Sequence, residues 1–467
     1  MVLLHLIYKE MIIKKCKLFI FKFAVLCSIY SCAEKKISTY VVINKLAVAD
    51  TALFKTVQLQ TFKYFWDGAE PSSGCARERY HIDNIYPDND KNIVTSGGTG
   101  FGVMAILVGI ERHFITRDSG RIRLEKMIAF LETADRFRGA WPHWWNGETG
   151  KVKPFSQYDD GGDLVETSFL LQGLLCVRQY FARGNTQEKM LAARVDKLWR
   201  QTEFNFYRNN KNVLYWHWSP KHGFKMNFAV QGYNECLIMY VLAASSPTHA
   251  VPATVYHQGW ADNGKIKDTT SYAGYSLYLK YQGSPPQGGP LFWAHYSYLG
   301  LDPRGLKDSY ADYWKENKNL SLINYTWCVN NPKKFKGYSK NNWGLTASYS
   351  TQGYAAHAPN MENDLGVITP SAALSSFPYT PTQSMAAMKY WFANDTLKEK
   401  IWGPFGFYDA FSETQNWYPP HYLAIDEGPI VVMMENYRTG LLWNLFMSCP
   451  EIKVGLTKLG FKSPHFK

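Results

Sequence analysis

The sequence has 467 residues, of which 46% are hydrophobic and 16% aromatic, and its formal net charge is +12 at pH 7. An aromatic content this high excludes a disordered or fibrous protein, because such chains lack the apolar side chains that a packed core needs. The positive charge lies in short clusters rather than in a long Lys/Arg stripe, so we expect no nucleic-acid partner.

Residues 1–32 have the pattern of a targeting segment. Lysines precede an apolar stretch at 18–29, and Ser31 and Cys32 follow it. A charged region, a short apolar region and a small residue before cysteine are typical of a bacterial lipoprotein signal, with Cys32 lipidated; an ordinary cleaved signal peptide is the alternative. The stretch is too short to predict a membrane-spanning helix. We therefore expect a lipid-anchored protein in the periplasm or outer membrane.

Residues 33–50 predict a short linker, and residues 51–467 predict one helical domain. Apolar residues recur mostly at helical spacing, and Gly/Pro/Asn-rich connections separate the helical segments. Helices are expected at roughly 51–66, 99–114, 120–137, 163–182, 186–204, 230–244, 249–261, 290–300, 307–326, 370–376, 381–393 and 429–447. About a dozen helices without a fixed repeat or an internal linker favour a closed helical toroid over a parallel α/β fold. A solenoid or a multi-bundle protein is the alternative.

The cysteines beyond the targeting segment predict buried thiols. They are widely spaced and odd in number, which does not suit a disulfide framework. They are Cys75, Cys176, Cys236, Cys328 and Cys449. The sequence has no CxxC and no HExxH motif, so we expect no metal site, and nothing in it predicts a cofactor.

Two groups of aromatic residues, at 141–145 and 215–218, lie in loop-like stretches. Flat ring faces can stack on the C–H faces of a sugar, so Trp141 and Trp216 are candidate ligand contacts. The alternative is that the rings pack beneath the loops. His143 and His217 lie in the same stretches, where the simpler role is to satisfy local backbone groups.

The first acidic cluster lies at 157–167, where four carboxylates fall within eight residues. A glycine pair interrupts the chain before the helix expected at 163, so Asp163 is placed to cap this helix, and Glu166 completes a capping-box pattern. That structural role does not account for Asp159, which lies close to Gln157. Carboxylates this close repel one another unless they meet donors, and sugar hydroxyls are suitable donors.

Glu235 lies at the edge of an apolar run, beside Tyr233. A solvated glutamate in the first turn of a helix is one interpretation. The other is a partly buried carboxyl whose pKa is raised by desolvation, as a general acid requires near neutral pH.

The second acidic cluster contains Asp426 and Glu427 and precedes the helix expected at 429–447. Asp426 either caps that helix or points into a cleft. Two separate acidic segments suit glycoside hydrolysis, in which one carboxyl donates a proton and another activates water or attacks the sugar carbon.

Several segments together resemble the bacterial "glycoamylase" domain, glycoside hydrolase family 144. They are 157–167, Gly232 to Glu235, Ile425 to Pro429, Gly97 to Phe101, and Gly353-Tyr354 to Pro370 through Ala373. The likeness spans roughly residues 50–450. It implies an all-α (α/α)6 toroid that hydrolyses β-1,2-glucan, either internally or by releasing sophorose from chain ends, with an inverting mechanism. The acidic positions of the family fall on Asp159, Asp163, Glu166, Glu235 and Asp426.

Within this resemblance, we assign Glu235 as the acid and Asp426 as the base, because they come from different segments and can flank the scissile bond. Asp426, near a helix N-terminus, is expected to be ionised. Asp163 is the alternative catalytic group. The substrate-binding candidates are Asp159, Glu166, Gln157, Tyr233, Trp141 and Trp216.

Three other functions stay open. They are an exo-acting α-glucosidase of glucoamylase type, a non-catalytic glycan-binding envelope lipoprotein, and a polysaccharide lyase. A lyase would want basic residues around a uronate, which the acidic clusters oppose. We expect a monomer that binds neutral β-1,2-glucan or its oligosaccharides.

Overall fold

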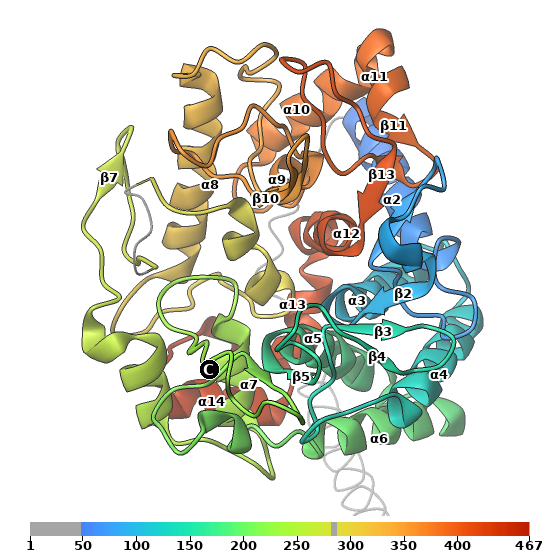
Figure 1. Ribbon diagram of the computed structural model, residues 1–467, viewed down its shortest axis with the longest axis vertical. Coiled ribbons are helices and arrows are strands. Elements are labelled where there is room, and N and C mark those ends of the chain that lie inside the picture. The colour runs from blue at the N-terminus through green and yellow to red at the C-terminus, as the bar shows by residue number, and fades with distance from the viewer. Residues whose placement is uncertain (1–47, 282–286, 467) are drawn as a thin grey trace, which may run out of the picture. The chain divides into compact units, whose positions relative to one another are not determined.

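A computed structural model describes residues 48–281 and 287–466 (Figure 1). The predicted targeting segment, with Cys32, and most of the predicted linker lie outside the described residues. Leu46–Lys467 form one unit. Its first helix, α2, begins at Val48, slightly before the expected start at residue 51.

The inner helices of this unit are buried on nearly all sides. In α3, every residue from Ser96 to Ile110 is buried, and α7 is buried along its whole length. A helix without a polar face must be covered on every side, which places these helices in the interior. The inner elements are α3 (Ser96–Glu111), α5 (Leu164–Phe181), α7 (Leu237–Ser245), the 3₁₀ turns η5 (Leu291–Ala294) and η6 (Tyr296–Leu299), α9 (Pro370–Leu374) and α12 (Ala424–Thr439).

The inner elements pack side by side, and α12 closes them into a ring. Helix α5 contacts α3 and α7, η6 contacts α7 and α12, and α12 contacts α9 and α3 (Figure 1). Glycines allow the closest approach: a Cβ on Gly100 of α3 would lie 2.4 Å from the carbonyl oxygen of Phe169 on α5. Because α12 returns to α3, residues from opposite ends of the described chain become neighbours.

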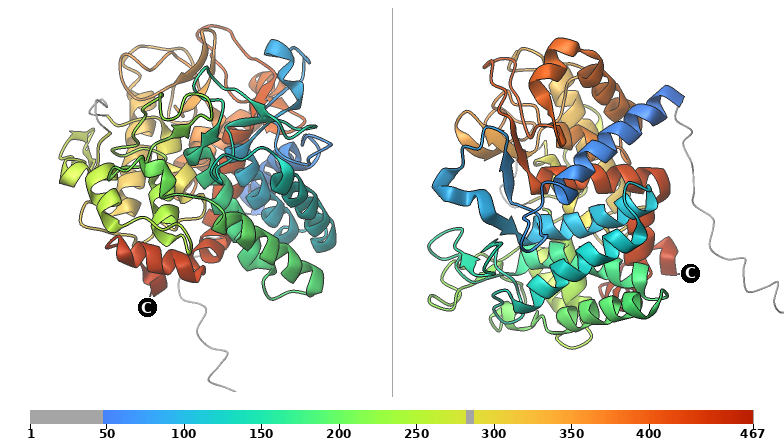
Figure 2. Two further views of the ribbon diagram at one scale, coloured as in Figure 1. Left: turned by 60° about the horizontal axis from the view of Figure 1, so that its bottom comes forward. Right: turned by 90° about the vertical axis from the view of Figure 1, so that its right-hand side faces the viewer.

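The outer helices cover this ring, as the ribbons of Figure 2 show for α2, α4 and α6. Helix α6 buries Leu191, Val195, Leu198 and Trp199 and begins with a complete capping box at Asn185 and Glu188. The outer elements are α2 (Val48–Trp66), α4 (Arg117–Thr133), α6 (Thr186–Arg200), the π-helical η3 (Val255–Trp260), α8 (Tyr313–Asn330), α10 (Pro381–Ala393), α11 (Asp395–Ile401), α13 (Leu441–Met447) and α14 (Pro450–Lys458).

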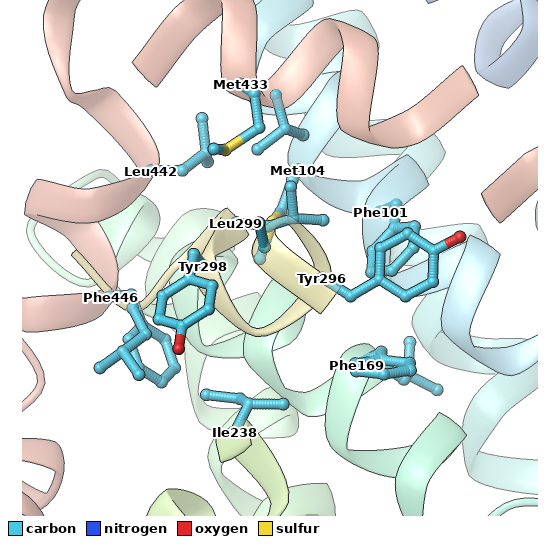
Figure 3. Packing of buried hydrophobic residues seen from close by; sticks show 14 of the residues in the cluster. Phe101, Met104, Phe169, Ile238, Tyr296, Tyr298, Leu299, Met433, Leu442 and Phe446 are labelled. Atoms are coloured by element: carbon cyan, nitrogen blue, oxygen red, sulfur yellow. The ribbon is translucent and has the colours of Figure 1, made fainter. Parts of the chain in front are cut away.

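Large side chains from the inner elements fill the centre of the ring (Figure 3). Phe101 of α3 packs against Phe169 of α5 and Tyr296 of η6, with ring centroids 5.7 and 5.1 Å apart. Met433 of α12 and Leu442 of α13 are fully buried in the same cluster. The middle of the toroid is therefore a packed core rather than a channel.

The strands are short, antiparallel and confined to connections. Strand β1 (Arg79–His81) pairs with β13 (His421–Leu423), and β5 (Gly162–Asp163) pairs with β6 (His217–Trp218). The others are β2 (Ile93–Thr95), β3 (Trp144–Asn146), β4 (Val152–Lys153), β7 (Ser271–Tyr272), β8 (Tyr275–Ser276), β9 (Ala347–Ser350), β10 (Gly353–Ala356), β11 (Trp402–Gly403) and β12 (Gly406–Phe407). Single 3₁₀ turns complete the chain at η1 (Pro87–Asn92), η2 (Phe206–Arg208), η4 (Asp262–Gly264) and η7 (Pro464–Phe466).

Some helix boundaries differ from the sequence-based expectation. Helix α12 begins at Ala424 and contains Pro429 in its second turn, where the missing N–H of proline removes one intrahelical hydrogen bond. Asp426 therefore lies inside the first turn instead of before it. Helix α7 begins at Leu237 rather than near 230, since Gly232 has a φ of +80° and the Asn234 side chain accepts from the Cys236 N–H at 2.9 Å. The segments expected to be helical at 249–261 and 290–300 form only π and 3₁₀ turns, and α11 and α14 were not predicted.

The predicted state of the cysteines is confirmed. All five described cysteines are free and buried. Among the described residues, no helix is long and apolar enough to cross a membrane.

Candidate functional site

The acidic residues singled out in the sequence lie where the inner helices begin. Glu166, in the first turn of α5, accepts a hydrogen bond at 2.8 Å from the backbone N–H of Gly97 in the first turn of α3. Ser371, in the first turn of α9, donates to Asp426 in the first turn of α12 at 2.6 Å. Four N-termini thus meet at one end of the ring. The partial positive charge of helix N-termini favours carboxylates at this position.

Asp163 caps α5, as predicted, and is fully buried. Its Oδ1 accepts from the Glu166 N–H at 2.9 Å. The second half of the capping box is missing, because the Glu166 side chain reaches α3 instead of returning to the cap. The Oδ2 atom of Asp163 accepts from Trp216 Nε1 at 3.0 Å and from His143 Nδ1 at 3.1 Å, and it lies 3.3 Å from His217 Nε2.

The two histidines form a charged cluster with Asp159 and Asp163. His217 Nε2 lies 3.0 Å from Asp159 Oδ2. Although burial opposes it, the carboxylates raise the pKa of His143 to about 10 and that of His217 to about 9, and both imidazoliums hold the pKa of Asp163 far below its usual range. The simpler role expected for these histidines, satisfying local backbone, is therefore wrong. At neutral pH they are cations that pair with the Asp163 carboxylate and lie beside Asp159.

Glu235 lies immediately before α7 and is buried, with 9% of its surface exposed. Burial raises its pKa to about 7, and the nearby charges of Glu166 and Asp163 act in the same direction. Its backbone is fixed, because the Ser297 hydroxyl donates to its carbonyl oxygen. The interpretation of Glu235 as a solvated first-turn glutamate is wrong, and the carboxyl holds its proton up to neutral pH.

Asp426 is 2% exposed, and burial raises its pKa well above the usual range. A second carboxyl, Asp409, lies beside it and raises the pKa of Asp426 further. The expectation that Asp426 is a separate, freely ionised carboxylate is therefore wrong. Sequence reasoning missed Asp409, which stands alone in an aromatic stretch without any acidic neighbour.

The other candidate substrate-binding residues differ in how far they are buried. Gln157 is exposed, and Trp216 is partly exposed beside Phe228. Tyr233 is buried, and its hydroxyl donates to Asn317 Oδ1 at 2.7 Å. Trp141 is fully buried beneath Arg136, and its indole N–H donates to the Leu131 carbonyl at 3.2 Å. Its ring has no exposed face for a ligand.

Further aromatic residues frame the acidic groups. The buried Tyr296 hydroxyl has no hydrogen-bond partner among residues 48–281 and 287–466. Burial raises the pKa of Tyr296 well above its usual range, and the charges of Asp426, Glu166 and Glu235 add to the shift, which places these groups around one phenol. Phe155, half-exposed, stacks on His143 with centroids 4.3 Å apart. No sequence pattern marked Tyr296 or Phe155.

Two groups of side chains in the described part of the chain have the composition of a metal site. They are His81 with Asp83 and His421, and His143 with Asp159 and Asp163; within each group the ligand atoms lie within 4.8 Å of one another. A metal ligand must be deprotonated, whereas the raised pKa of His143 keeps its ring protonated. The second group therefore fits an ion-pair cluster better than a metal site.

Comparisons with known proteins agree with this geometry. The family model "Putative glucoamylase" (Glycoamylase) matches residues 227–450. An endo-β-1,2-glucanase from Chitinophaga pinensis, solved with sophorotriose and glucose, is 66% identical, covers 90% of this chain and is itself covered completely, with a TM-score of 0.88. An exo β-1,2-glucooligosaccharide sophorohydrolase from Parabacteroides distasonis is 42% identical over 92% of this chain, which spans 61% of that relative's length.

A more distant structure extends the comparison of folds. An endo-β-1,2-glucanase from Talaromyces funiculosus, 11% identical, shares the fold over 88% of each chain with a TM-score of 0.64. The predicted all-α (α/α)6 toroid is confirmed.

Proposed function

Because the chain belongs to the Glycoamylase family, as its resemblance to glycoside hydrolase family 144 predicted, we propose that it is a hydrolase of β-1,2-glucan. The observation that carries the proposal is the pair of buried carboxyls, Glu235 and Asp426, at the N-terminal ends of two inner helices. Glu235 holds its proton near neutral pH, as a general acid must.

In the proposed reaction, Glu235 gives its proton to the glycosidic oxygen as the bond from that oxygen to the anomeric carbon breaks. Asp426 takes a proton from a water molecule, whose oxygen forms the new bond on the opposite face of the sugar. This is hydrolysis with inversion. The charged cluster of Asp159, Asp163, His143 and His217 would hold sugar hydroxyls, and exposed rings such as Phe155 would stack on the sugars.

The high identity to the Chitinophaga enzyme over its full length favours internal cleavage. The Parabacteroides sophorohydrolase contains much additional sequence that this chain does not match. We therefore propose an endo-acting enzyme. Sophorose release from chain ends is the second possibility within the same reaction.

Product sizing over time tests this proposal. We expect linear β-1,2-glucan to yield a broad series of oligosaccharides within the first minutes, and α-linked glucans to yield nothing. Disaccharide as the sole early product would overturn endo action and leave the hydrolase proposal in place. Binding of the glucan without any product would favour a non-catalytic glycan-binding protein.

We also propose that Cys32 anchors the mature protein to a membrane, on the support of its lipoprotein-like sequence. Two-phase detergent partitioning should place the parent protein in the detergent phase and Cys32→Ala in the aqueous phase, because an acyl chain supplies the membrane affinity. Cys75→Ala is a matched control, since this buried cysteine lies within the helical unit. A parent protein in the aqueous phase contradicts the anchor and supports a cleaved signal peptide.

A further inference from the structure

His81, Asp83 and His421 lie together where β1 pairs with β13. His81 and His421 are register partners, and their rings stack with centroids 3.6 Å apart and an angle of 13° between their planes. Asp83 Oδ2 lies 3.1 Å from His421 Nε2. One ligand atom from each of the three side chains lies within 4.8 Å of the others. Two imidazoles and one carboxylate therefore converge beside this pair of strands.

The contacts of His81 leave one of its ring nitrogens available to a metal. Its Nδ1 contacts the carbonyl oxygen of Ile85, which can only accept a hydrogen bond, so Nδ1 carries the ring proton. Nε2 then has the lone pair, and the Tyr349 hydroxyl reaches it only at 3.3 Å, a long distance for a hydrogen bond. Histidines that bind metals commonly have this arrangement, because a carbonyl that accepts from the other ring N–H fixes the tautomer.

The charge state of this group differs from that of the cluster around His143. Burial lowers the pKa of His81, so its ring is neutral at neutral pH. Although burial opposes it, the Ile85 N–H and His421 hold the pKa of Asp83 below its usual range, so this carboxyl is ionised. A neutral imidazole and an ionised carboxylate are the forms in which these side chains bind a metal.

The spacing and exposure of these side chains suit a four-coordinate zinc ion. At the usual Zn–N and Zn–O distances of about 2.0–2.2 Å, the ligand atoms of a tetrahedral site lie about 3.3 Å apart. The contact between Asp83 and His421, at 3.1 Å, is close to this spacing, and the ligand atom of His81 has to approach by at most about 1.5 Å. Asp83 and His421 are 33% and 21% exposed, so an ion can enter from solvent and water can supply the fourth ligand.

We propose that His81, Asp83 and His421 bind one Zn²⁺ ion, which ties β1 to β13. Two imidazoles select zinc and similar transition metals over Ca²⁺ and Mg²⁺, which prefer oxygen ligands. No local motif marks this site in the sequence, because Asp83 and His421 are 338 positions apart. No step of the proposed glucan hydrolysis uses the ion. Since β13 leads directly into α12, the ion fixes the start of the helix that carries Asp426.

The alternative is that these side chains join the strands through ring stacking and one ion pair, and a matched pair elsewhere separates the two roles. His465 Nε2 lies 2.8 Å from Asp302 Oδ2, and His465 belongs to no group of three possible metal ligands in the described part of the chain. His465→Ala therefore removes a histidine–aspartate contact alone, whereas His421→Ala also removes a metal ligand. Asp83→Asn keeps the shape of the side chain and its contact with the Ile85 N–H, and loses the carboxylate.

The experiment titrates ZnCl₂, and separately CaCl₂, into the purified protein after treatment with EDTA and measures the heat of binding. We expect the parent and His465→Ala to bind one zinc ion per chain, and His421→Ala and Asp83→Asn to bind it about tenfold or more weakly. Zinc at about 100 times its dissociation constant should raise the melting temperature of the parent by about 3 °C, because it binds the folded state alone. The two ligand variants should show no such rise at the same zinc concentration.

Three results would overturn the zinc site. They are a parent that binds no zinc, a parent that binds calcium as tightly as zinc, and ligand variants that bind zinc as tightly as the parent, which would place the ion at another group such as the His143 cluster. If His421→Ala fails to fold, Asp83→Asn decides the question, since Asp83 is exposed. Zinc binding is measured without substrate, so a parent that does not hydrolyse glucan refutes the proposed function and leaves the zinc site in place.

Discussion

We expect Glu235→Gln to lower kcat/KM on β-1,2-glucan by at least about a hundredfold, because general acids contribute roughly 10²–10⁴-fold. The amide has nearly the shape of the protonated carboxyl and cannot give up a proton. Since Glu235 is neutral below its pKa of about 7, the substitution changes no charge there, and the melting temperature should stay near that of the parent. Initial rates and thermal unfolding of the same preparation check both statements.

The pH profile gives an independent readout for Glu235. The raised pKa means that the acid form is present below about pH 7 and is lost above it, so kcat/KM of the parent should fall as pH rises beyond about 7. Glu70→Gln is a control in which stability rather than activity should change. Glu70 is buried and accepts hydrogen bonds from Ser72 and Ser73, outside the acidic site. It should lower the melting temperature and leave the rate intact. If Glu235→Gln retains more than about a tenth of parental activity, Glu235 is not the acid.

Asp426→Asn should also lower kcat/KM by at least about a hundredfold with a small effect on the melting temperature. An amide cannot accept the proton of the attacking water, whereas it can still accept from Ser371 and donate to Asp409, so the local hydrogen bonds survive. Single-turnover rates with the purified variant measure the loss of chemistry separately from product release.

Asp163→Asn distinguishes the base from an ion-pair partner. Asp163 accepts from several donors, and its pKa lies far below the usual range, which makes it a weak proton acceptor. Its replacement leaves the His143 and His217 cations poorly compensated, so the melting temperature should fall by roughly 5 °C along with the activity. A stable and inactive Asp163→Asn beside an active Asp426→Asn would transfer the role of base to Asp163.

The helical segments of the fold could be predicted because their signals are local. The apolar residues of the segments that became α3, α5 and α10 recur at helical spacing, and Asp163 caps α5 by contacts within its own turn. The errors arise where tertiary contacts override the local pattern. Pro429 predicted a helix start and lies inside α12, and Gly232 with Asn234 delays α7 beyond the apolar run that predicted it.

The residues that lie in the site could be predicted from the sequence more readily than their protonation states. Glu235 and Asp163 stood out by their sequence neighbours, and the structure places both at the inner N-termini. The protonation states of Asp163 and Asp426 depend on partners that are distant in sequence. These partners are His217 for Asp163 and Asp409 for Asp426. Asp409 had no local signal, because its significance depends on its influence on Asp426, which lies in a different element. Charged groups that are distant in sequence, rather than composition, therefore influence these protonation states.

The pairing of β1 with β13 and of α3 with α12 also has a consequence for folding. Neighbouring helices such as α3 and α4 can pack early, since the loop between them is short and its closure costs little entropy. The contacts of α12 with α2 and α3 span most of the chain and are entropically expensive to form. The first turn of α12, with Asp426, reaches the N-terminus of α3 only when these contacts form. The catalytic end of the molecule is thus assembled late, and no fragment that stops before α12 contains both carboxyls.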